Sequence, residues 1–173
     1  MAELSLWEII RSGAMLAILG ATISVILGTI ASSKATGRVG EAAVGLLCED
    51  PSKFGGALVL QILPSTQGLY AFVVWFVAIF MKIGTDYGWD KVFLPVEQGG
   101  MSMITGGAIL LACLPVAIVS VFSGLYQGRL AAASISILAK KPEAQGNAIV
   151  MCVMVEFLMI LAFLSSLLVL FSL

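Results

Sequence analysis

Long stretches without charge constrain this chain more than any other feature of its sequence. Residues 12–33, 54–81 and 98–128 carry no charged side chain, and residues 144–173 carry only Glu156. Each stretch exceeds the roughly 20 residues with which a helix crosses about 30 Å of hydrocarbon. Because backbone surrounded by lipid must satisfy its own hydrogen bonds, these stretches are predicted to be transmembrane helices.

The predicted architecture is an all-α membrane protein. We expect four helices, over about 5–47, 53–83, 98–139 and 143–172. Some are longer than a bilayer requires, so their ends should protrude or tilt. The composition, 60% hydrophobic and 11% charged, excludes a water-soluble globule and a disordered chain. The start of the chain lacks the basic residues of a cleaved signal peptide, and none is expected.

Missing residues and motifs exclude several functional classes. The chain has no histidine, which excludes His-based catalytic triads and imidazole metal sites. Its net charge is −1 without a basic cluster, so nucleic acid is not an expected partner. No GxxxxGK[ST] pattern is present, so direct ATP binding through a phosphate-binding loop is not expected either.

The distribution of cationic residues predicts the orientation in the membrane. The first and third interhelical turns, with their flanks, hold Lys34, Arg38, Lys53, Arg129, Lys140 and Lys141. The opposite side holds only Arg11, Lys82 and Lys91. By the positive-inside rule, these two turns are cytoplasmic and both termini lie outside. Trp7, Tyr87 and Trp89 would then lie at the outer interface, which amphipathic rings prefer.

The two halves of the chain are similar in sequence. Residues 37–72, shifted by 91 positions, align with residues 128–163 without a gap. In this alignment Pro51 of the first turn meets Pro142 of the other turn. A helical hairpin was therefore copied, and the chain is expected to consist of two duplicated hairpins.

The duplication divides the chain into two predicted domains. Residues 1–91 would form the first hairpin and residues 92–173 the second. Glu156 aligns with Ser65, so the second hairpin has a carboxylate within the membrane region and the first lacks it.

Small residues follow the first and third predicted helices. In the first they are Gly13, Ala17, Ala21, Ser24, Gly28 and Ala31, and in the third Gly106, Gly107, Gly124 and Gly128. Such stripes let helix backbones approach closely in lipid. The other two helices are bulkier, which gives a wedge suited to a closed ring of identical copies, with the thin helices inside. Packing of the stripes within one chain is the alternative that the sequence leaves open.

Polar side chains inside the predicted membrane region are candidates for function. Glu156 is alone in its stretch, and a carboxylate at this depth is costly enough to mark a functional site. Thr66 and Gln67 lie 15 and 16 residues beyond the first turn proline, while Gln127 and Glu156 lie 15 before and 14 beyond the second. If both turns lie at one level, these side chains share a depth of roughly 22 Å along the helices.

The spacing also predicts one face of the second helix. Leu63, Thr66, Gln67 and Tyr70 follow at positions i, i+3, i+4 and i+7. Pro64 has no N–H, so it frees a backbone carbonyl close to this face.

One carboxylate surrounded by neutral oxygens is suited to a hard cation. A monovalent ion leaves such a site neutral, whereas a divalent ion leaves it positive in lipid, so the site favours Na⁺. A pure proton carrier needs the carboxyl of Glu156 but has little use for Thr66, Gln67 and Gln127.

Several motifs resemble the proteolipid subunit of V-type (A/V-type) rotary ATPases. Residues 60–70, LQILPSTQGLY, are similar to its second helix. Residues 123–128, SGLYQG, and 137–143, ILAKKPE, are similar to its third helix and second turn, and Val155-Glu156 to its fourth-helix carboxylate. The resemblance is greatest to the sodium-pumping bacterial type, called subunit K.

The resemblance implies the roles of individual residues. In that family the ion is held by positions that match Thr66, Gln67, Gln127 and Glu156, and by a backbone carbonyl that matches Leu63. The position that matches Tyr70 hydrogen-bonds to the carboxylate and closes over it.

The resemblance also implies a function and partners. Identical copies would form a lipid-embedded ring in a prokaryotic cell membrane and carry Na⁺ on Glu156. The ring would rotate against a static membrane subunit with half-channels, and its cytoplasmic turns would contact a central-stalk subunit. The chain itself would be non-catalytic, because ATP turns over on other subunits. Two alternatives remain open: a proton-translocating proteolipid of the same family, and a four-helix ion-coupled transporter unrelated to an ATPase.

Overall fold

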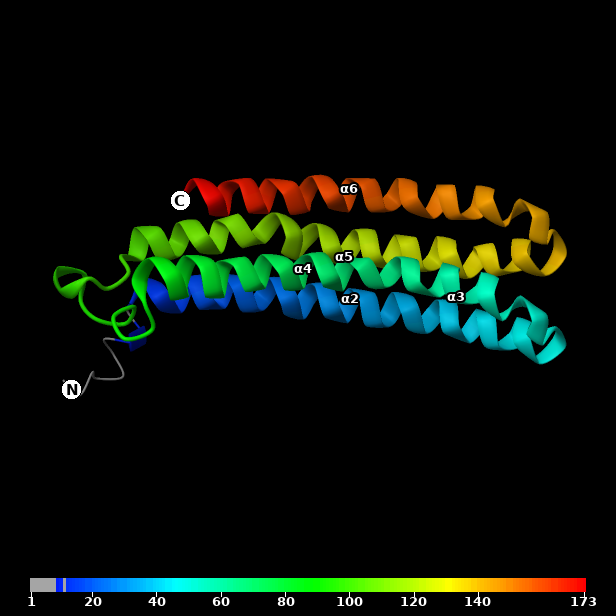
Figure 1. Cartoon of the computed structure of the whole chain (residues 1–173), viewed down its shortest axis with the longest axis horizontal. Coiled ribbons are helices and arrows are strands. Elements are labelled where there is room, and N and C mark those ends of the chain that lie inside the picture. Colours follow the sequence, from blue (N-terminus) through cyan, green and yellow to red (C-terminus); the bar gives the residue numbers. More distant parts are fainter. Residues whose placement is uncertain (1–8, 11) are drawn as a thin grey trace.

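A computed structural model describes residues 9–10 and 12–173 of the chain. In this part, four helices are long and apolar enough to cross a membrane, over Gly13–Glu49, Pro51–Tyr87, Met103–Lys140 and Pro142–Ser172. They run alongside one another, and no strand forms among the described residues (Figure 1). The predicted all-α class is therefore confirmed. The predicted start at about residue 5, Trp7 and Arg11 lie outside the described residues.

The first membrane helix is α2, Gly13–Glu49. It begins after Ser12, whose backbone is extended (φ −73°, ψ 146°). It ends two residues beyond the predicted end at 47, because Asp50 leaves the helical conformation and its carboxylate accepts a hydrogen bond from the Ser52 N–H of the following turn.

The second membrane helix is divided, whereas the sequence predicted one helix over 53–83. After a 3₁₀ turn at Pro51–Lys53 it consists of α3 (Phe54–Ile62), a 3₁₀ turn (Leu63–Ser65), α4 (Thr66–Phe76) and a π-helical segment (Val77–Tyr87). The 3₁₀ turn within the helix contains Pro64, which lacks an N–H and so interrupts the regular backbone ladder.

The third helix is α5, Met103–Lys140. The sequence predicted its start at about residue 98, and that prediction is wrong. Residues 96–98 form a separate 3₁₀ turn, and Gly99 after it has a φ of 90°, which takes the backbone out of the helical path. Ser102 then caps α5 by accepting a hydrogen bond from the Thr105 N–H at 3.1 Å.

The fourth helix, α6 (Gln145–Ser172), follows a 3₁₀ turn at Pro142–Ala144. Both hairpin turns lie at one end of the molecule, and the loop 88–102 and the C-terminal end of α6 lie at the other (Figure 1). The predicted domain boundary at 91/92 falls inside this loop, and it stays a prediction, as does the side of the membrane that each end faces.

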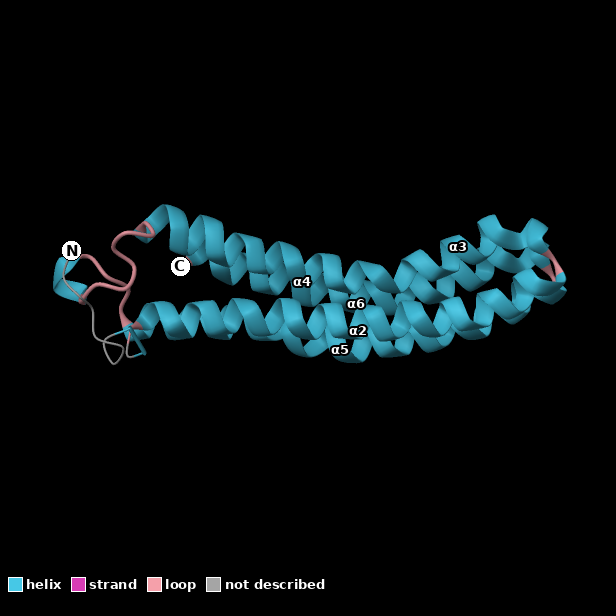
Figure 2. Cartoon of the chain, turned by 90° about the horizontal axis from the view of Figure 1, so that it is seen from below, coloured by secondary structure: helices cyan, strands magenta, loops and turns pink. Residues whose placement is uncertain are grey.

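The helices form two layers. Seen from below, α2 and α5 lie in one layer, and α3, α4 and α6 lie in the other (Figure 2). Glycines bring α2 and α5 together: a Cβ on Gly106 would lie 1.9 Å from the Gly13 carbonyl oxygen, and one on Gly128 would lie 2.6 Å from the Ala35 Cα. These members of the stripes therefore pack helices within the chain, which is the alternative that the sequence left open.

Candidate functional site

Glu156 of α6 is directed into the bundle. Its side chain is only 8% exposed, although α6 presents many large apolar side chains outward. The carboxylate accepts hydrogen bonds from the Tyr70 hydroxyl at 2.8 Å and from Gln127 Nε2 at 3.4 Å. Side chains of α4 and α5 therefore hold the one charged residue of this stretch in the interior.

Two buried glutamines extend the network around Glu156. Gln67 and Gln127 are fully buried, and Gln67 Nε2 donates to Gln127 Oε1 at 2.8 Å. Gln127 Nε2 also lies 3.3 Å from the Cys152 carbonyl of α6. Gln67 Oε1 is buried and has no hydrogen-bond partner among the described residues. Burying such an oxygen costs free energy unless a hydrogen-bond donor, a water molecule or a cation pairs with it.

Two further oxygens come from Leu63, which begins the 3₁₀ turn Leu63–Ser65, and from Thr66, the first residue of α4. The Thr66 hydroxyl donates to the Leu63 carbonyl at 2.8 Å. Both residues flank Pro64, where the helix is irregular, and both precede Gln67 on the same strip of the helix. The local break therefore places a main-chain oxygen and a hydroxyl within four residues of Gln67 in the chain.

Tyr70 lies one turn further along α4. Its ring packs against Phe163 of α6, with 5.1 Å between the ring centroids. This packing holds the ring while the hydroxyl reaches the carboxylate of Glu156. The hydrogen bond therefore has a fixed geometry and joins α4 to α6.

The structure links four of the candidate residues, Glu156, Gln127, Gln67 and Tyr70, through direct hydrogen bonds. Thr66 and Leu63 bond to each other instead. The role of all of them in binding an ion stays a prediction.

Sequence reasoning missed Ser32 of α2. Its hydroxyl accepts from the Gly68 N–H at 2.7 Å and lies 3.0 Å from the Pro64 carbonyl oxygen. A signal was available, because Ser32 follows Gly28 by one helical turn on the small-residue stripe. The first helix was nevertheless expected to contribute packing only.

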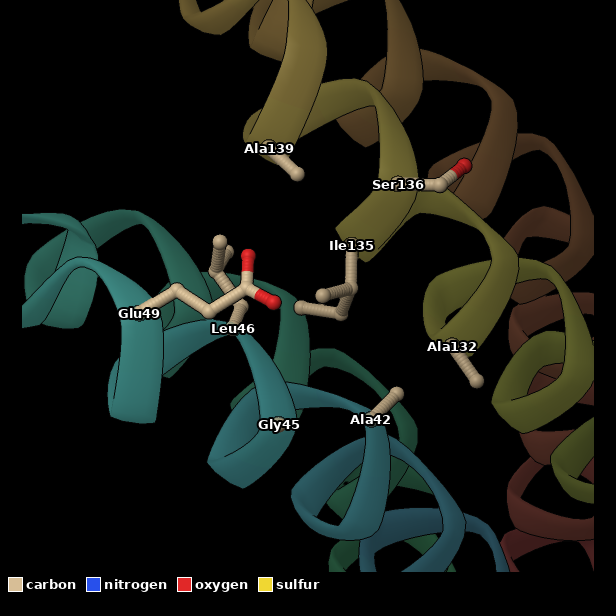
Figure 3. A pocket seen from close by; sticks show the side chains of 8 residues that line it. All are labelled: Ala42, Gly45, Leu46, Glu49, Ala132, Ile135, Ser136 and Ala139. Carbon is tan, nitrogen blue, oxygen red and sulfur yellow. The ribbon is translucent and has the colours of Figure 1, made fainter.

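A separate pocket opens between α2 and α5 near the hairpin turns (Figure 3). Its volume is about 320 Å³, and it is lined by Ala42, Gly45, Leu46, Glu49, Ala132, Ile135, Ser136 and Ala139. It shares no residue with the network around Glu156.

Comparisons with known proteins agree with this architecture. The family model for the C subunit of ATP synthase matches the chain twice, over residues 19–78 and 110–169, which is the register at which the two halves align. The V-type sodium ATPase subunit K of Enterococcus hirae is 43% identical over 90% of this chain and 90% of its own length. The A-type ATP synthase subunit K of Methanocaldococcus jannaschii is 27% identical over 90% of this chain and 96% of its own length.

Proposed function

The chain belongs to the family of ATP synthase C subunits, and from this premise we propose that it carries Na⁺ in the rotor ring of a V-type ATPase. It is a multi-pass integral membrane protein and a non-catalytic component of an ATPase ring. The family membership argues against a four-helix transporter unrelated to an ATPase.

The unpaired oxygen of Gln67 is the observation that carries the proposal. It is buried beside a network that contains a single carboxylate, and no described side chain or backbone donor reaches it. A neutral oxygen adds little to the protonation of Glu156, but it can replace part of the hydration shell of Na⁺. The single negative charge of Glu156 matches a monovalent ion.

The proposed ligands are Glu156, Gln127, Thr66, Gln67 and the Leu63 carbonyl. Gln127 now directs its N–H toward Glu156 and its oxygen toward Gln67. For this side chain to become a ligand, its amide must turn so that Oε1 faces the ion. The Tyr70 hydroxyl would remain on the carboxylate and close the site.

The mechanism follows from the cost of charge in lipid. A copy that faces lipid must keep Glu156 neutral, by Na⁺ or by a proton. A copy that faces the static subunit exchanges its ion through half-channels, and rotation is coupled to ATP turnover elsewhere in the complex.

The hairpin turns would form the surface that meets the central stalk. Lys53 Nζ donates to the Ala139 carbonyl at 2.8 Å, and Gln145 Nε2 donates to the Gly56 carbonyl at 3.0 Å. These hydrogen bonds join the two hairpins, so both turns would form one continuous surface for contact with the central stalk. The turns would be cytoplasmic and the termini outside, in the cell membrane of a prokaryote.

The test is the rate at which a carbodiimide labels Glu156 in the intact complex at fixed pH. The reagent attacks the protonated carboxyl, so bound Na⁺ should slow labelling while K⁺ should not. If the two ions protect equally, or if neither protects, the Na⁺ site is wrong and the proton-translocating alternative replaces it.

A further inference from the structure

Ser32 bridges two backbone groups of the second membrane helix. In a regular α-helix, the Gly68 N–H donates to the carbonyl of Pro64, four residues earlier. Here the Gly68 N–H donates to the Ser32 hydroxyl at 2.7 Å. That hydroxyl in turn lies 3.0 Å from the Pro64 oxygen and 3.3 Å from the Ser65 oxygen. A side chain of α2 thus takes part in the backbone ladder of another helix.

Glycines on both helices allow this approach. A Cβ on Gly28 would lie 2.3 Å from the Ala71 Cβ, so any side chain there would push α2 and α4 apart. A Cβ on Gly68 would lie 3.2 Å from the Ser32 hydroxyl oxygen. The hydroxyl is therefore seated by backbone packing, and Ser32 is 8% exposed.

The bridged segment carries the candidate ligands. Thr66 and Gln67 lie between the two bonded ends, and Leu63 immediately precedes the first end. Within the segment, the Thr66 N–H and hydroxyl both pair with the Leu63 carbonyl, but the Pro64 carbonyl and the Gly68 N–H take their partner from α2. Its conformation therefore depends on an outside contact.

We propose that Ser32 is a positioning residue of the ion site, which holds residues 63–68 in the conformation that presents their oxygens to Na⁺. This inference rests on the proposed function. Without the hydroxyl, the Gly68 N–H can pair directly with the Pro64 carbonyl, as in a regular helix. The segment would then tighten and turn Thr66 and Gln67 relative to α5 and α6.

The test compares Ser32→Ala with Ser33→Ala in the intact complex. Ser33 is the matched control, because its exposed hydroxyl bonds the Thr29 carbonyl of its own helix at 2.8 Å. The measurement is the Na⁺ concentration that halves carbodiimide labelling of Glu156. Loss of groups that orient ligands typically lowers metal affinity about 10–100-fold, so Ser32→Ala should need at least about tenfold more Na⁺. Ser33→Ala should behave as the wild type.

A merely structural role would lower the thermal stability of the ring without changing the half-protecting Na⁺ concentration. An assembled Ser32→Ala ring with wild-type Na⁺ protection would therefore overturn the inference. If that ring does not assemble, Ser32→Cys decides, because the thiol has a similar shape but is only a weak hydrogen-bond donor and acceptor. Weakened protection supports the inference, and wild-type protection overturns it. Absence of Na⁺ protection in the wild type would instead overturn the proposed function, and this inference with it.

Discussion

Tyr70→Phe isolates the hydrogen bond that closes over the carboxylate. The substitution keeps the ring, and thus its packing on Phe163 at 5.1 Å, but removes the hydroxyl that donates to Glu156 at 2.8 Å. A hydrogen bond to a charged group contributes about 1.5–3 kcal/mol. Because Tyr70 is only half-buried, the lower end applies. That value corresponds to a loss of about tenfold in Na⁺ affinity.

The assay is the Na⁺ concentration that halves carbodiimide labelling of Glu156 at fixed pH, measured on the intact complex. Tyr126→Phe serves as the matched control. Its ring is 59% exposed and lies beside Arg129, with 5.6 Å from the guanidinium carbon to the ring centroid, away from the network. This control should leave the half-protecting concentration unchanged.

An unchanged half-protecting concentration in Tyr70→Phe would refute the reasoning. It would mean that the hydroxyl does not stabilise the ion-bound carboxylate. An equal shift in both variants would refute it too, because the effect would then not depend on the hydrogen bond to Glu156.

The remaining predictions concern the carboxylate, its ligands and the glycine contacts. Glu156→Gln should leave an assembled ring but abolish ion-coupled ATPase activity; near-normal coupled activity would remove this residue from the mechanism. Thr66→Ala and Gln127→Ala should each raise the half-protecting Na⁺ concentration about 10–150-fold, since each removes one neutral oxygen that contacts the charged ion, and K⁺ titrations give the control. Gly128→Ala should lower the melting temperature of the ring, because the new Cβ would lie 2.6 Å from the backbone of α2. Gly37→Ala, with open space around its Cβ, should not.

The membrane helices could be predicted because lipid permits few solutions. Uncharged stretches of this length must be helices. Pro51 and Pro142, which align between the two halves, marked the turn of each hairpin. The start of α5 was predicted too early because residues 98–102 are uncharged, and the uncharged stretch does not reveal that the backbone leaves the helical path at Gly99. The second helix is divided at Pro64. The sequence predicted that this proline would free one backbone carbonyl, whereas the structure has a complete 3₁₀ turn there.

The residues around Glu156 could also be predicted, because counting from the turns places side chains at one depth. Counting cannot predict which way an amide points. The structure directs the Gln127 N–H, rather than its oxygen, toward the carboxylate. Counting from the turns could not identify Ser32 either. Its contacts are with backbone atoms more than thirty positions away in the sequence, and such contacts leave no spacing pattern.

Because only one of the two hairpins has a carboxylate, the ring moves fewer ions in each revolution. The chain places Glu156 in its second hairpin and Ser65 at the matching position of the first, over four membrane helices in the described part. A ring of such chains has half as many ion-binding carboxylates as a ring with the same number of helices and a carboxylate in every hairpin. Each revolution then moves half the charge. For a fixed amount of work per ATP, each ion can then be moved against a steeper electrochemical gradient. The arrangement therefore transports fewer ions per ATP but can maintain a larger gradient.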